Sequence, residues 1–402
     1  MERERGGRSG GSRRIIGNLD CEESWGERAK GLSMPARVLR SISALATLLR
    51  AYAEDGDRLW TPRPVSPARL AAVPGLAIPV LESGPLDRQA AASHTLAWGR
   101  TLAVDGDAAR SRLPADARPF AAGGGLAERL WAIDPPGHAV AARVNDRLFC
   151  LELARDLGIS LPGAQWIESI EGLKAHLSRE GAVGSKGKWV LKARHSAAGR
   201  SRIWGEGTRL DRDAGRSIAK LLGRCGPVVF EPWMERTEDF GCLAVLDRKG
   251  MHALGIHRLD VDSKGGFRGI ELPSGAGRWA WLLPEEEADL DRALEGAAER
   301  LDAAGYRGPF GIDCWRYRDR EGRLRFNPLG EINARMSFGL VARGIREKLE
   351  RAGRIREGAP LRLRVGRGAD ETLRAPGRET SVPILLPEPG EPTAAWVELV
   401  DR

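Results

Sequence analysis

The sequence predicts a soluble mixed α/β protein built from two or three domains. Its 402 residues are enough chain for more than one buried core. Hydrophobic residues make up 42% and charged residues 29%, which is the balance of a globular chain. Strand-like and helix-like patterns alternate from about residue 144 onward. No apolar run reaches the length of about 18 residues that a membrane helix needs, so we expect no membrane partner.

Helices are predicted where apolar residues recur at three- and four-residue spacing and turn residues follow. The leucines of VNDRLFCLELARDLG keep this spacing after Val144, and Gly158 ends that helix. The other predicted helices are an amphipathic one near 36–54, then Ser169–Glu180, about 211–222, and a long one with an acidic first turn at about 284–305.

Strands are predicted where short apolar runs lie between turn residues. They are Arg14–Asn18, Trp189–Ala193, Pro227–Phe230, a pair joined by a turn at Asp247–Gly250, a hairpin with its turn at Asp319–Gly322, and Leu361–Val365. A loop is predicted from the end of Trp189–Ala193 to Trp204.

The predicted organisation has four parts. Residues 1–14 are Gly, Ser and Arg with little to bury and are expected to be a disordered tail. Residues 15–142 are expected to form an irregular α/β domain, and 143–350 the main domain. Residues 351–402 form a C-terminal extension that is rich in Arg, Gly and Pro and shows no recognisable chemistry.

The cysteines indicate the cellular compartment, and the net charge limits which kinds of binding partner the sequence predicts. The five cysteines have neither the density of a disulfide framework nor a CxxC spacing for zinc, which favours a reducing cytoplasm. The net charge of +8 fits nucleic acid, acidic lipid or a small anionic ligand, but the arginine-rich composition accounts for it without any of these partners. Because no stripe combines aromatic and basic residues, no nucleic-acid partner is expected.

The predicted hairpin brings three oxygen ligands together. Glu331 and Asn333 are two residues apart and share one face of an extended strand. Folding about the turn brings Asp313 opposite residues 329–331. Two carboxylates and an amide oxygen suit a hard cation such as Mg²⁺. The alternative, that these residues are solvated ends of a surface hairpin, remains open.

Two further segments have the composition of a nucleotide site. Lys192 ends an apolar strand and is followed by ARHSAAGRSR, whose small and basic residues can approach phosphate closely. Downstream, the strand VVF runs into Glu231, Pro232, Trp233 and Met234, where unpaired backbone groups can bind a planar base. A basic surface loop and an ordinary edge strand with a core tryptophan are the respective alternatives.

The helix start Asn145-Asp146-Arg147 is followed along the chain by four motifs. In this order they resemble the ATP-grasp superfamily of carboxylate-amine ligases. The motifs are VLKARHSAAGR, VVFEPWMER, GPFGIDCW and EINARMSFG, and the resemblance covers roughly residues 143–345. It implies an ATP-grasp fold made of α+β lobes, with a lid lobe at about 165–235 and an N-terminal preceding α/β domain. It also implies that two lobes clasp ATP and that an acyl phosphate forms before an amine attacks.

The resemblance also implies roles for individual residues. It places Arg147 and Lys192 on the ATP phosphates, the latter on the α- and β-phosphates, with Ser196 to Arg202, including Gly199, as a closing phosphate loop. Glu231 to Met234 resembles the adenine hinge and Glu238 the carboxylate that binds ribose. Asp313, Glu331 and Asn333 match the magnesium ligands.

The chain departs from the family pattern at two positions. Arg147 stands where many members have a lysine, and an arginine there still binds phosphate. Gly311 stands where several peptide-forming members have an arginine, which leaves Arg268 or Arg335 as the candidate catalytic arginine near the substrate.

Three other features receive structural interpretations. His195 is expected to be a hydrogen-bonded loop histidine rather than a proton shuttle. Cys314 alternates with Asp313 and is expected in the core. Asp20, Glu22 and Glu23 are expected to lie in a solvated loop, although a place in a substrate pocket remains open.

The functional hypothesis is therefore an ADP-forming enzyme that joins a small carboxylate to a small amine with ATP and Mg²⁺, or Mn²⁺ in its place. An ATP-grasp phosphotransferase and a non-catalytic nucleotide-binding protein are the alternatives. A monomer or homodimer is expected, and the sequence does not identify either substrate.

Overall fold

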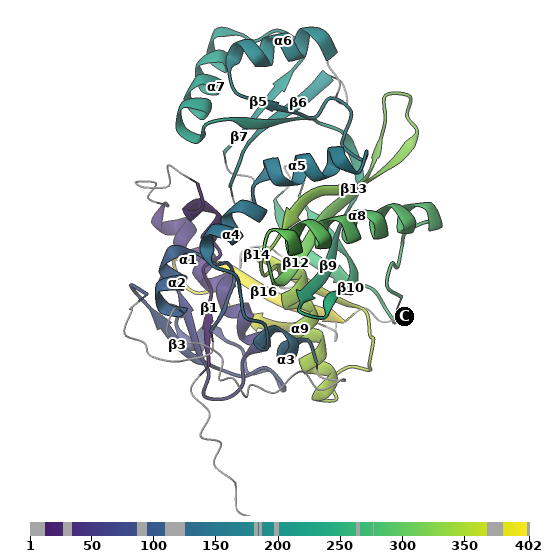
Figure 1. The fold of residues 1–402 in the computed structure, drawn as a ribbon. Coiled ribbons are helices and arrows are strands. Elements are labelled where there is room, and N and C mark those ends of the chain that lie inside the picture. Colours follow the sequence, from purple (N-terminus) through teal and green to yellow (C-terminus); the bar gives the residue numbers. More distant parts are fainter. Residues whose placement is uncertain are drawn as a thin grey trace, which may run out of the picture.

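The structure is a computed structural model. It describes residues 13–26, 34–86, 95–108, 125–180, 184, 187–196, 201–262, 266–275, 277–367 and 381–399. These residues form three sheets with helices packed against them, so the predicted mixed α/β class is confirmed. In Figure 1 the small sheet with α6 and α7 lies above the large central sheet, and the N-terminal part flanks the central sheet.

The N-terminal part contains a parallel four-stranded sheet of order β3-β2-β1-β4. The strands are β1 (Arg14–Ile16), β2 (Arg58–Thr61), β3 (Val80–Ser83) and β4 (Thr95–Ala97). The sequence predicted only the first of them, because strands of three or four residues carry almost no periodic signal. The expected helix near 36–54 is α1 (Ala36–Ala46) followed by the 3-10 helix η2 (Thr47–Tyr52). The other elements are η1 (Cys21–Ser24), η3 (Pro67–Arg69), α2 (Leu102–Ala108) and α3 (Leu126–Trp131).

Residues 165–232, which the resemblance predicts as the lid lobe and which are called the lid below, contain an antiparallel sheet of order β5-β8-β6-β7 covered by two helices. Its elements are β5 (Gln165–Ile167), α6 (Ile170–Glu180), β6 (Lys188–Ala193), β7 (Arg202–Glu206), α7 (Arg212–Cys225) and β8 (Val228–Pro232). Trp189, Leu191 and Phe230 pack with the two helices in a separate core. The predicted loop to Trp204 is wrong at its end, because β7 begins at Arg202 and pairs with β6.

The central sheet has eight strands in the order β13-β12-β9-β10-β11-β14-β16-β15. They are β9 (Glu235–Asp247), β10 (Gly250–Val261), β11 (Phe267–Leu272), β12 (Gly308–Arg318), β13 (Leu324–Asn333), β14 (Leu361–Arg367), β15 (Ser381–Leu385) and β16 (Thr393–Leu399). The last three come from the chain after residue 351, so the C-terminal extension continues this sheet instead of standing apart from it.

Helices cover both faces of the central sheet. Alternate residues of β9 pack on opposite sides: Cys242 lies in the core with α5 (Arg147–Asp156) and α8 (Pro284–Ala303). Leu243 lies in the core with α9 (Phe338–Arg351) and η2. The short helix α4 (His138–Val144) leads into α5. No helix in the described ranges has both the length and the apolar character to span a bilayer.

The hairpin β12–β13 has the register that the sequence predicted. Asp313 pairs directly with Glu331, and Gly311 pairs with Asn333. The residues on either side of Asp313 are Ile312 and Cys314. Both side chains are buried in the core beneath α8, which confirms the core position of Cys314. Glu331 on β13 reaches the space between the central sheet and the small sheet, where it pairs with Arg147.

Candidate active site

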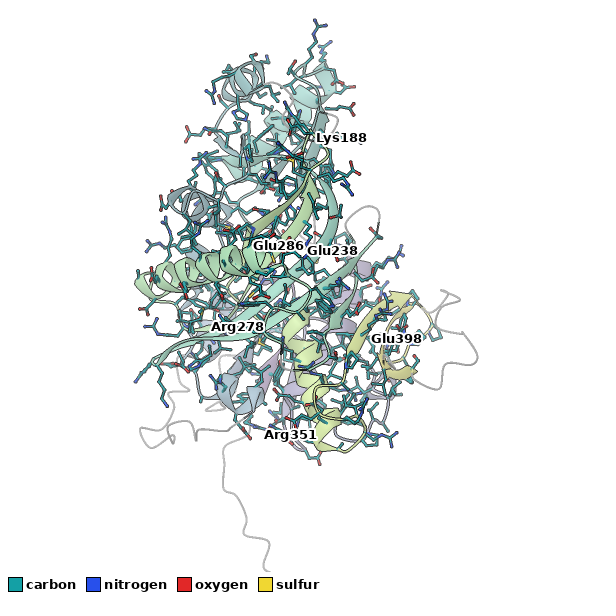
Figure 2. All side chains as sticks on the ribbon, turned by 90° about the vertical axis from the view of Figure 1, so that its right-hand side faces the viewer. Lys188, Glu238, Arg278, Glu286, Arg351 and Glu398 are labelled. Atoms are coloured by element: carbon teal, nitrogen blue, oxygen red, sulfur yellow. The ribbon has the colours of Figure 1, made fainter. Side chains whose placement is uncertain are left out.

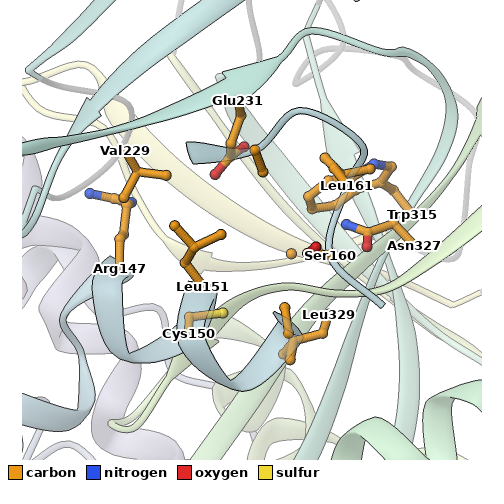
Figure 3. A pocket seen from close by; sticks show the side chains of 13 residues that line it. Arg147, Cys150, Leu151, Ser160, Leu161, Val229, Glu231, Trp315, Asn327 and Leu329 are labelled. Carbon is orange, nitrogen blue, oxygen red and sulfur yellow. The ribbon is translucent and has the colours of Figure 1, made fainter. Parts of the chain in front are cut away.

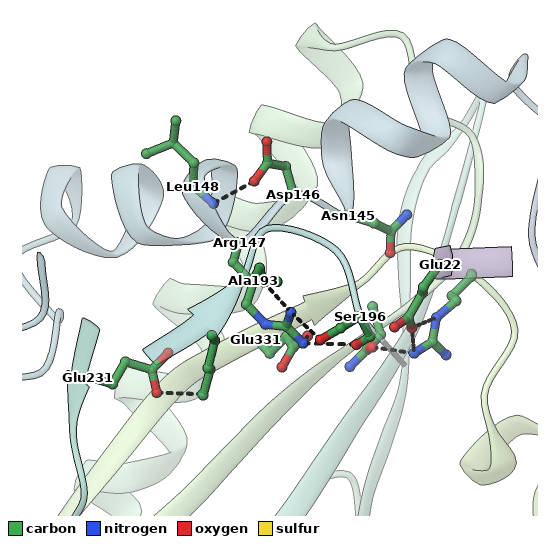
Figure 4. Close-up of polar contacts among 12 residues, drawn as sticks. Glu22, Asn145, Asp146, Arg147, Leu148, Ala193, Ser196, Glu231 and Glu331 are labelled. Atoms are coloured by element: carbon green, nitrogen blue, oxygen red, sulfur yellow. Dashed lines mark hydrogen bonds and ion pairs between the residues drawn. The ribbon is translucent and has the colours of Figure 1, made fainter. Parts of the chain in front are cut away.

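The start of helix α5 lies where the lid and the central sheet meet. Asp146 caps the helix by accepting a hydrogen bond from the backbone of Leu148 at 3.0 Å. This cap fixes Arg147 as the first helical residue, and its side chain is 7% exposed. The arginine therefore lies buried between lid and sheet, next to the predicted metal ligands (Figure 4).

Arg147 joins the lid to strand β13 through four hydrogen bonds. It donates to the Ala193 carbonyl at 2.6 Å, to Ser196 Oγ at 3.1 Å and to the Ser196 carbonyl at 3.2 Å. Its other contact is an ion pair with Glu331 Oε1 at 2.7 Å. Burial acts to lower the pKa of Arg147, but Glu331 and other nearby carboxylates raise it overall. The side chain stays a cation at the centre of the cleft.

Lys192 lies at the end of β6 and is 4% exposed. Its Nζ donates to Glu231 Oε2 at 2.5 Å, and Glu231 lies on the neighbouring strand β8. Burial lowers the pKa of Lys192, against the opposing effect of Glu231 and Glu331. A lysine and a carboxylate thus face the cleft from the lid.

Asp313, Glu331 and Asn333 come together as the sequence predicted. Asp313 is directly opposite Glu331 and accepts a hydrogen bond from the Asn333 side chain. Burial and the Glu331 charge raise the pKa of Asp313 to about 7. Burial also acts to raise the pKa of Glu331, but Arg147, Lys192 and further cations lower it overall.

These three residues fit a magnesium ion by the chemistry of their donors. All three offer oxygen, which is the ligand that Mg²⁺ prefers. Two partly buried carboxylates face each other, and the raised pKa of Asp313 indicates that a further positive charge would be favourable there. The described residues contain no group of three or more His, Cys, Asp or Glu side chains that could hold a metal, so this site depends on the Asn333 amide.

Arg335 lies beyond the end of β13 and links it to the N-terminal part. Its Nη2 donates to Asn333 Oδ1 at 2.8 Å, and its Nε donates to Glu22 Oε1 at 2.7 Å. Burial acts to lower the pKa of Arg335, but Glu22 raises it overall. Glu22 is 8% exposed, so the expectation that it lies in a solvated loop is wrong.

The lid is fastened to the α4–α5 junction by further contacts. Arg194 forms an ion pair with Asp146, with Nε at 2.8 Å from Oδ2. His195 Nε2 donates to the Ala142 carbonyl at 2.8 Å, which confirms a hydrogen-bonded loop histidine. Burial lowers the pKa of His195. Residues 193–196 thus form a clamp that holds the lid near the central sheet.

A small pocket lies between the hinge strand β8 and helix α5 (Figure 3). It has a volume of about 30 Å³ and is lined mainly by apolar side chains, among them Leu151, Val229 and Leu329. Glu231 and Arg147 supply its charged edge. Met234 lies next to it, packed with Trp315 and Leu161. The pocket has room for water but not for a purine, so a base can enter only if the lid opens.

Three predicted site residues are not part of this cluster. Arg268 is exposed and paired with Asp262 at 3.6 Å, on a strand four positions away from β13 in the sheet. Glu238 is held by Arg258 at 2.9 Å and by Arg316, which also binds Glu286. Figure 2 shows Glu238 and Glu286 close together beside α8. Gly199 lies outside the described residues.

The structure adds residues that the sequence did not single out as site residues. Trp315 and Asn327 line the small pocket, and Trp315 Nε1 and Asn327 Nδ2 are both buried without a hydrogen-bond partner among the described residues. The only sequence signal for Trp315 and Asn327 was their alternation with core residues along predicted strands. Arg202, which the resemblance placed at the end of the closing phosphate loop, pairs across the strands with Lys192.

A second, larger cavity of about 330 Å³ lies between the lid, α4 and η1. Glu22, Trp25 and His195 line it, together with the side chains of Arg143 and Arg224. Through Glu22 its wall reaches Arg335 and the predicted metal ligands. The cavity therefore adjoins the cluster on the side away from the small pocket.

This arrangement, a lid sheet over an antiparallel central sheet with a parallel N-terminal sheet beside it, is the ATP-grasp fold that the sequence predicted. N5-carboxyaminoimidazole ribonucleotide synthetase from Thermus thermophilus shares it at 16% identity over 97% of this chain and 94% of that chain, with a TM-score of 0.55. The Staphylococcus aureus N5-carboxyaminoimidazole synthetase complexed with ADP matches at 11% identity over 98% and 94%, with a TM-score of 0.52. The carboxyaminoimidazole ribonucleotide synthase from Aspergillus clavatus complexed with ATP matches at 13% over 97% and 94%, with a TM-score of 0.52.

At these identities the likeness establishes the fold. No protein-family model matches the sequence. No curated protein is significantly similar to it.

Proposed function

We propose that this protein is an ATP- and Mg²⁺-dependent ligase that activates a carboxylate as an acyl phosphate and joins it to an amine. The observation that carries the proposal is the buried cluster between lid and β13. There Arg147, Lys192 and Arg335 surround the facing carboxylates Asp313 and Glu331. Phosphoryl transfer needs charge neutralisation and positioning more than a nucleophilic side chain, and this cluster offers both.

In this proposal the nucleotide lies along the lid. The base occupies the small pocket beside the hinge Glu231 to Met234 once the lid opens, and Lys192 and Arg147 bind the phosphates. Asp313, Glu331 and Asn333 hold Mg²⁺, which when bound neutralises charge on the phosphate oxygens. Binding the nucleotide replaces contacts that the lid now makes to α5.

The proposed reaction has two steps. A carboxylate oxygen of the substrate attacks the γ-phosphorus of ATP, and ADP leaves with the electron pair of the broken bond. The amine nitrogen then attacks the acyl carbon, phosphate leaves, and the nitrogen loses a proton to solvent. Arg335 is a catalytic residue in this scheme, because its guanidinium beside Asn333 can bind two oxygens of the transferring phosphoryl group.

The cavity of about 330 Å³ is the proposed place for the substrate that reacts with the activated phosphate. Its size is within the range of small-molecule sites, and its Glu22 wall touches Arg335. This position would present a small molecule to the same cluster that binds the phosphates from the other side.

The proposal is tested by incubating the protein with ATP, Mg²⁺ and pools of small carboxylates and amines, and by separating ADP, AMP and phosphate. We expect ADP and phosphate that depend on both pools. The Asp313→Asn variant should lose this turnover, while Asp289→Asn, a change at an exposed position of α8, should keep it. AMP with pyrophosphate would overturn the ligase chemistry, and ADP without phosphate release would indicate a phosphotransferase.

A further inference from the structure

We propose that Arg236 covers the aromatic surface on which the nucleotide base stacks, so that a base binds only by displacing this guanidinium. This role of Arg236 rests on the proposed nucleotide site and adds to it a residue that competes with the ligand. Arg236 is the second residue of β9 and follows the hinge, residues 231–234, by two positions.

Trp315 forms a fixed aromatic wall beside the hinge. It lies on β12, is 3% exposed and lines the small pocket together with Glu231. Its ring packs with Met234 of the hinge. On β13, Gly330 leaves the space that the indole fills, because an added Cβ there would overlap the ring. An indole held in this way offers a surface on which a planar base can stack.

The guanidinium of Arg236 lies on the Trp315 ring. Its central carbon is 3.7 Å from the centroid of that ring, which places the two groups in direct contact. The same carbon is 5.3 Å from the ring centroid of Trp233, a residue of the hinge. A guanidinium and a base are both planar groups that stack on aromatic rings, so they would compete for the same surface.

The electrostatic neighbours of Arg236 place it inside the cleft. Burial acts first to lower the pKa of Lys192, and the positive charge of Arg236 acts in the same direction. Burial acts to raise the pKa of Asp313, and Arg236 acts to lower it. Arg236 is therefore close both to the lysine proposed for the phosphates and to a proposed metal ligand. A nucleotide that runs from the hinge to Lys192 must pass the guanidinium.

Arg236 is held in place by contacts that a ligand can replace. In the part of the chain that the structure describes, Asp239 is the one carboxylate paired with Arg236, at 2.8 Å between Nη1 and Oδ1. The two side chains are 27% and 16% exposed, and ion pairs that touch solvent contribute little to stability. Because the guanidinium already touches solvent, it can leave the indole without crossing the core.

Displacement of Arg236 would supply room that the small pocket lacks. The pocket lined by Trp315 and Glu231 holds about 30 Å³, which is too little for a base. The indole surface under Arg236 adjoins this pocket, since Trp315 belongs to both. Opening of the lid and departure of the guanidinium are then two separate conditions for base binding.

The test is the affinity of the full-length protein for adenosine, MgADP and inorganic triphosphate, measured by calorimetry. The wild type is compared with Arg236→Ala and with Arg236→Lys, which keeps the charge and loses the planar group. We expect Arg236→Ala to bind adenosine about three- to tenfold more tightly, because the base no longer displaces a stacked guanidinium. Inorganic triphosphate has no base and should gain no affinity. The matched control is Arg292→Ala, which removes an arginine with the same i,i+3 aspartate pair from α8 and should bind as the wild type does.

A double-mutant cycle shows whether the gain depends on the indole. Trp315→Leu should weaken adenosine binding about tenfold or more, because the stacking surface is lost. In the Trp315→Leu background, Arg236→Ala should bring no gain, because the guanidinium then covers no aromatic ring. Circular dichroism checks that each variant is folded. Where Arg236→Ala or Trp315→Leu fails to fold, the comparison of the wild type with Arg236→Lys decides, and adenosine should bind more tightly to Arg236→Lys.

The outcomes separate this role from the proposed function. Equal or weaker adenosine binding after removal of the guanidinium overturns the role of Arg236 and leaves the proposed function intact. The same gain with and without Trp315 also overturns it, because the indole is then not the surface that Arg236 covers. If neither the wild type nor any variant binds MgADP, the proposed function fails, and the role of Arg236 falls with it.

Discussion

Each of three cations in the cleft, two buried and one partly buried, is neutralised by a carboxylate from a different element. Arg147 on α5 pairs with Glu331 on β13, Lys192 on β6 pairs with Glu231 on β8, and Arg335 pairs with Glu22 on η1. A buried charge whose partner is removed is strongly destabilising, because its desolvation is no longer compensated. These pairs therefore hold the cleft together before any nucleotide binds.

Replacing Arg147 with Met should lower the free energy of unfolding by about 3 kcal/mol. The change leaves Glu331 without its closest cation and removes three hydrogen bonds to the lid. Urea unfolding followed by circular dichroism measures the loss. Arg216→Met, at an exposed position on the lid, is the control and should change the stability by less than about 0.5 kcal/mol. Equal stability of the two variants would refute this account of Arg147.

Replacing Arg335 with Lys should reduce the turnover found in the product assay roughly a hundredfold, with nucleotide affinity nearly unchanged. Arg335 uses separate nitrogens to contact Asn333 and the Met336 carbonyl while it pairs with Glu22, and a lysine cannot reproduce this planar arrangement. Steady-state kinetics and calorimetry give the two quantities. Turnover at the wild-type rate would remove Arg335 from the catalytic residues.

At the scale of elements, local signals were enough to predict the hairpin β12–β13 that carries the proposed metal ligands. The turn at Asp319–Gly322 fixes the register, so that Asp313 meets Glu331 as the sequence predicted. Ile312, the residue before Asp313 on β12, packs in the core and so identifies the buried face of the hairpin. The strands β6 and β8 and the helices α6, α7 and α8 were likewise predicted within a few residues of their bounds.

Contacts between distant segments could not be predicted in the same way. Glu22 reaches Arg335 across 313 residues of chain, and no periodic pattern encodes how η1 docks on β13. Arg202 was placed in a loop because RIWGE is short and follows small residues, and only pairing with Lys192 makes it a strand. Arg268 was a candidate because Gly311 stands where the family pattern has an arginine. Its distance from the site follows from the order of the strands, which the sequence did not give.

The packing of α9 on the central sheet depends on a buried histidine in β10. The His257 ring lies between Gly241 and Gly339, where added Cβ atoms would be 2.4 Å and 2.5 Å from it. Burial, and then the charge of Arg343 on α9, lower the pKa of His257 to about 3. The imidazole is therefore neutral in the folded protein at every pH above that value.

This histidine should make the protein less stable in acid. In the unfolded chain its pKa is about 6.5, so between pH 6.5 and pH 3 the unfolded state binds more protons than the folded state. The free energy of unfolding should fall by up to about 1.4 kcal/mol for each pH unit below 6.5 from this group. Urea unfolding at pH 7.5, 6 and 5 of the wild type and His257→Leu measures the slope. The same slope in both proteins would show that other groups cause the acid sensitivity.

At the scale of the whole molecule, the small sheet, the central sheet and the N-terminal helix η1 all contribute residues to one cleft. The clamp of residues 193–196 ties the lid to the α4–α5 junction through Arg147, Asp146 and Ala142. The small pocket beneath the lid holds only about 30 Å³, which excludes a purine. Under the proposed function, nucleotide entry therefore requires a more open state, whose population would set the observed association rate.

Weakening the clamp should speed nucleotide association. Arg194 and Asp146 form a partly buried pair, with 33% and 7% of the side chains exposed, and Asp146 still caps α5 when Arg194 is replaced. Losing a pair worth about 1 kcal/mol would raise the population of the open lid about fivefold. Stopped-flow fluorescence with MgATP should therefore give an association rate constant for Arg194→Gln up to about fivefold above the wild type. Arg216→Gln should match the wild type, and an association rate for Arg194→Gln at or below the wild-type value would mean that opening the clamp does not limit entry.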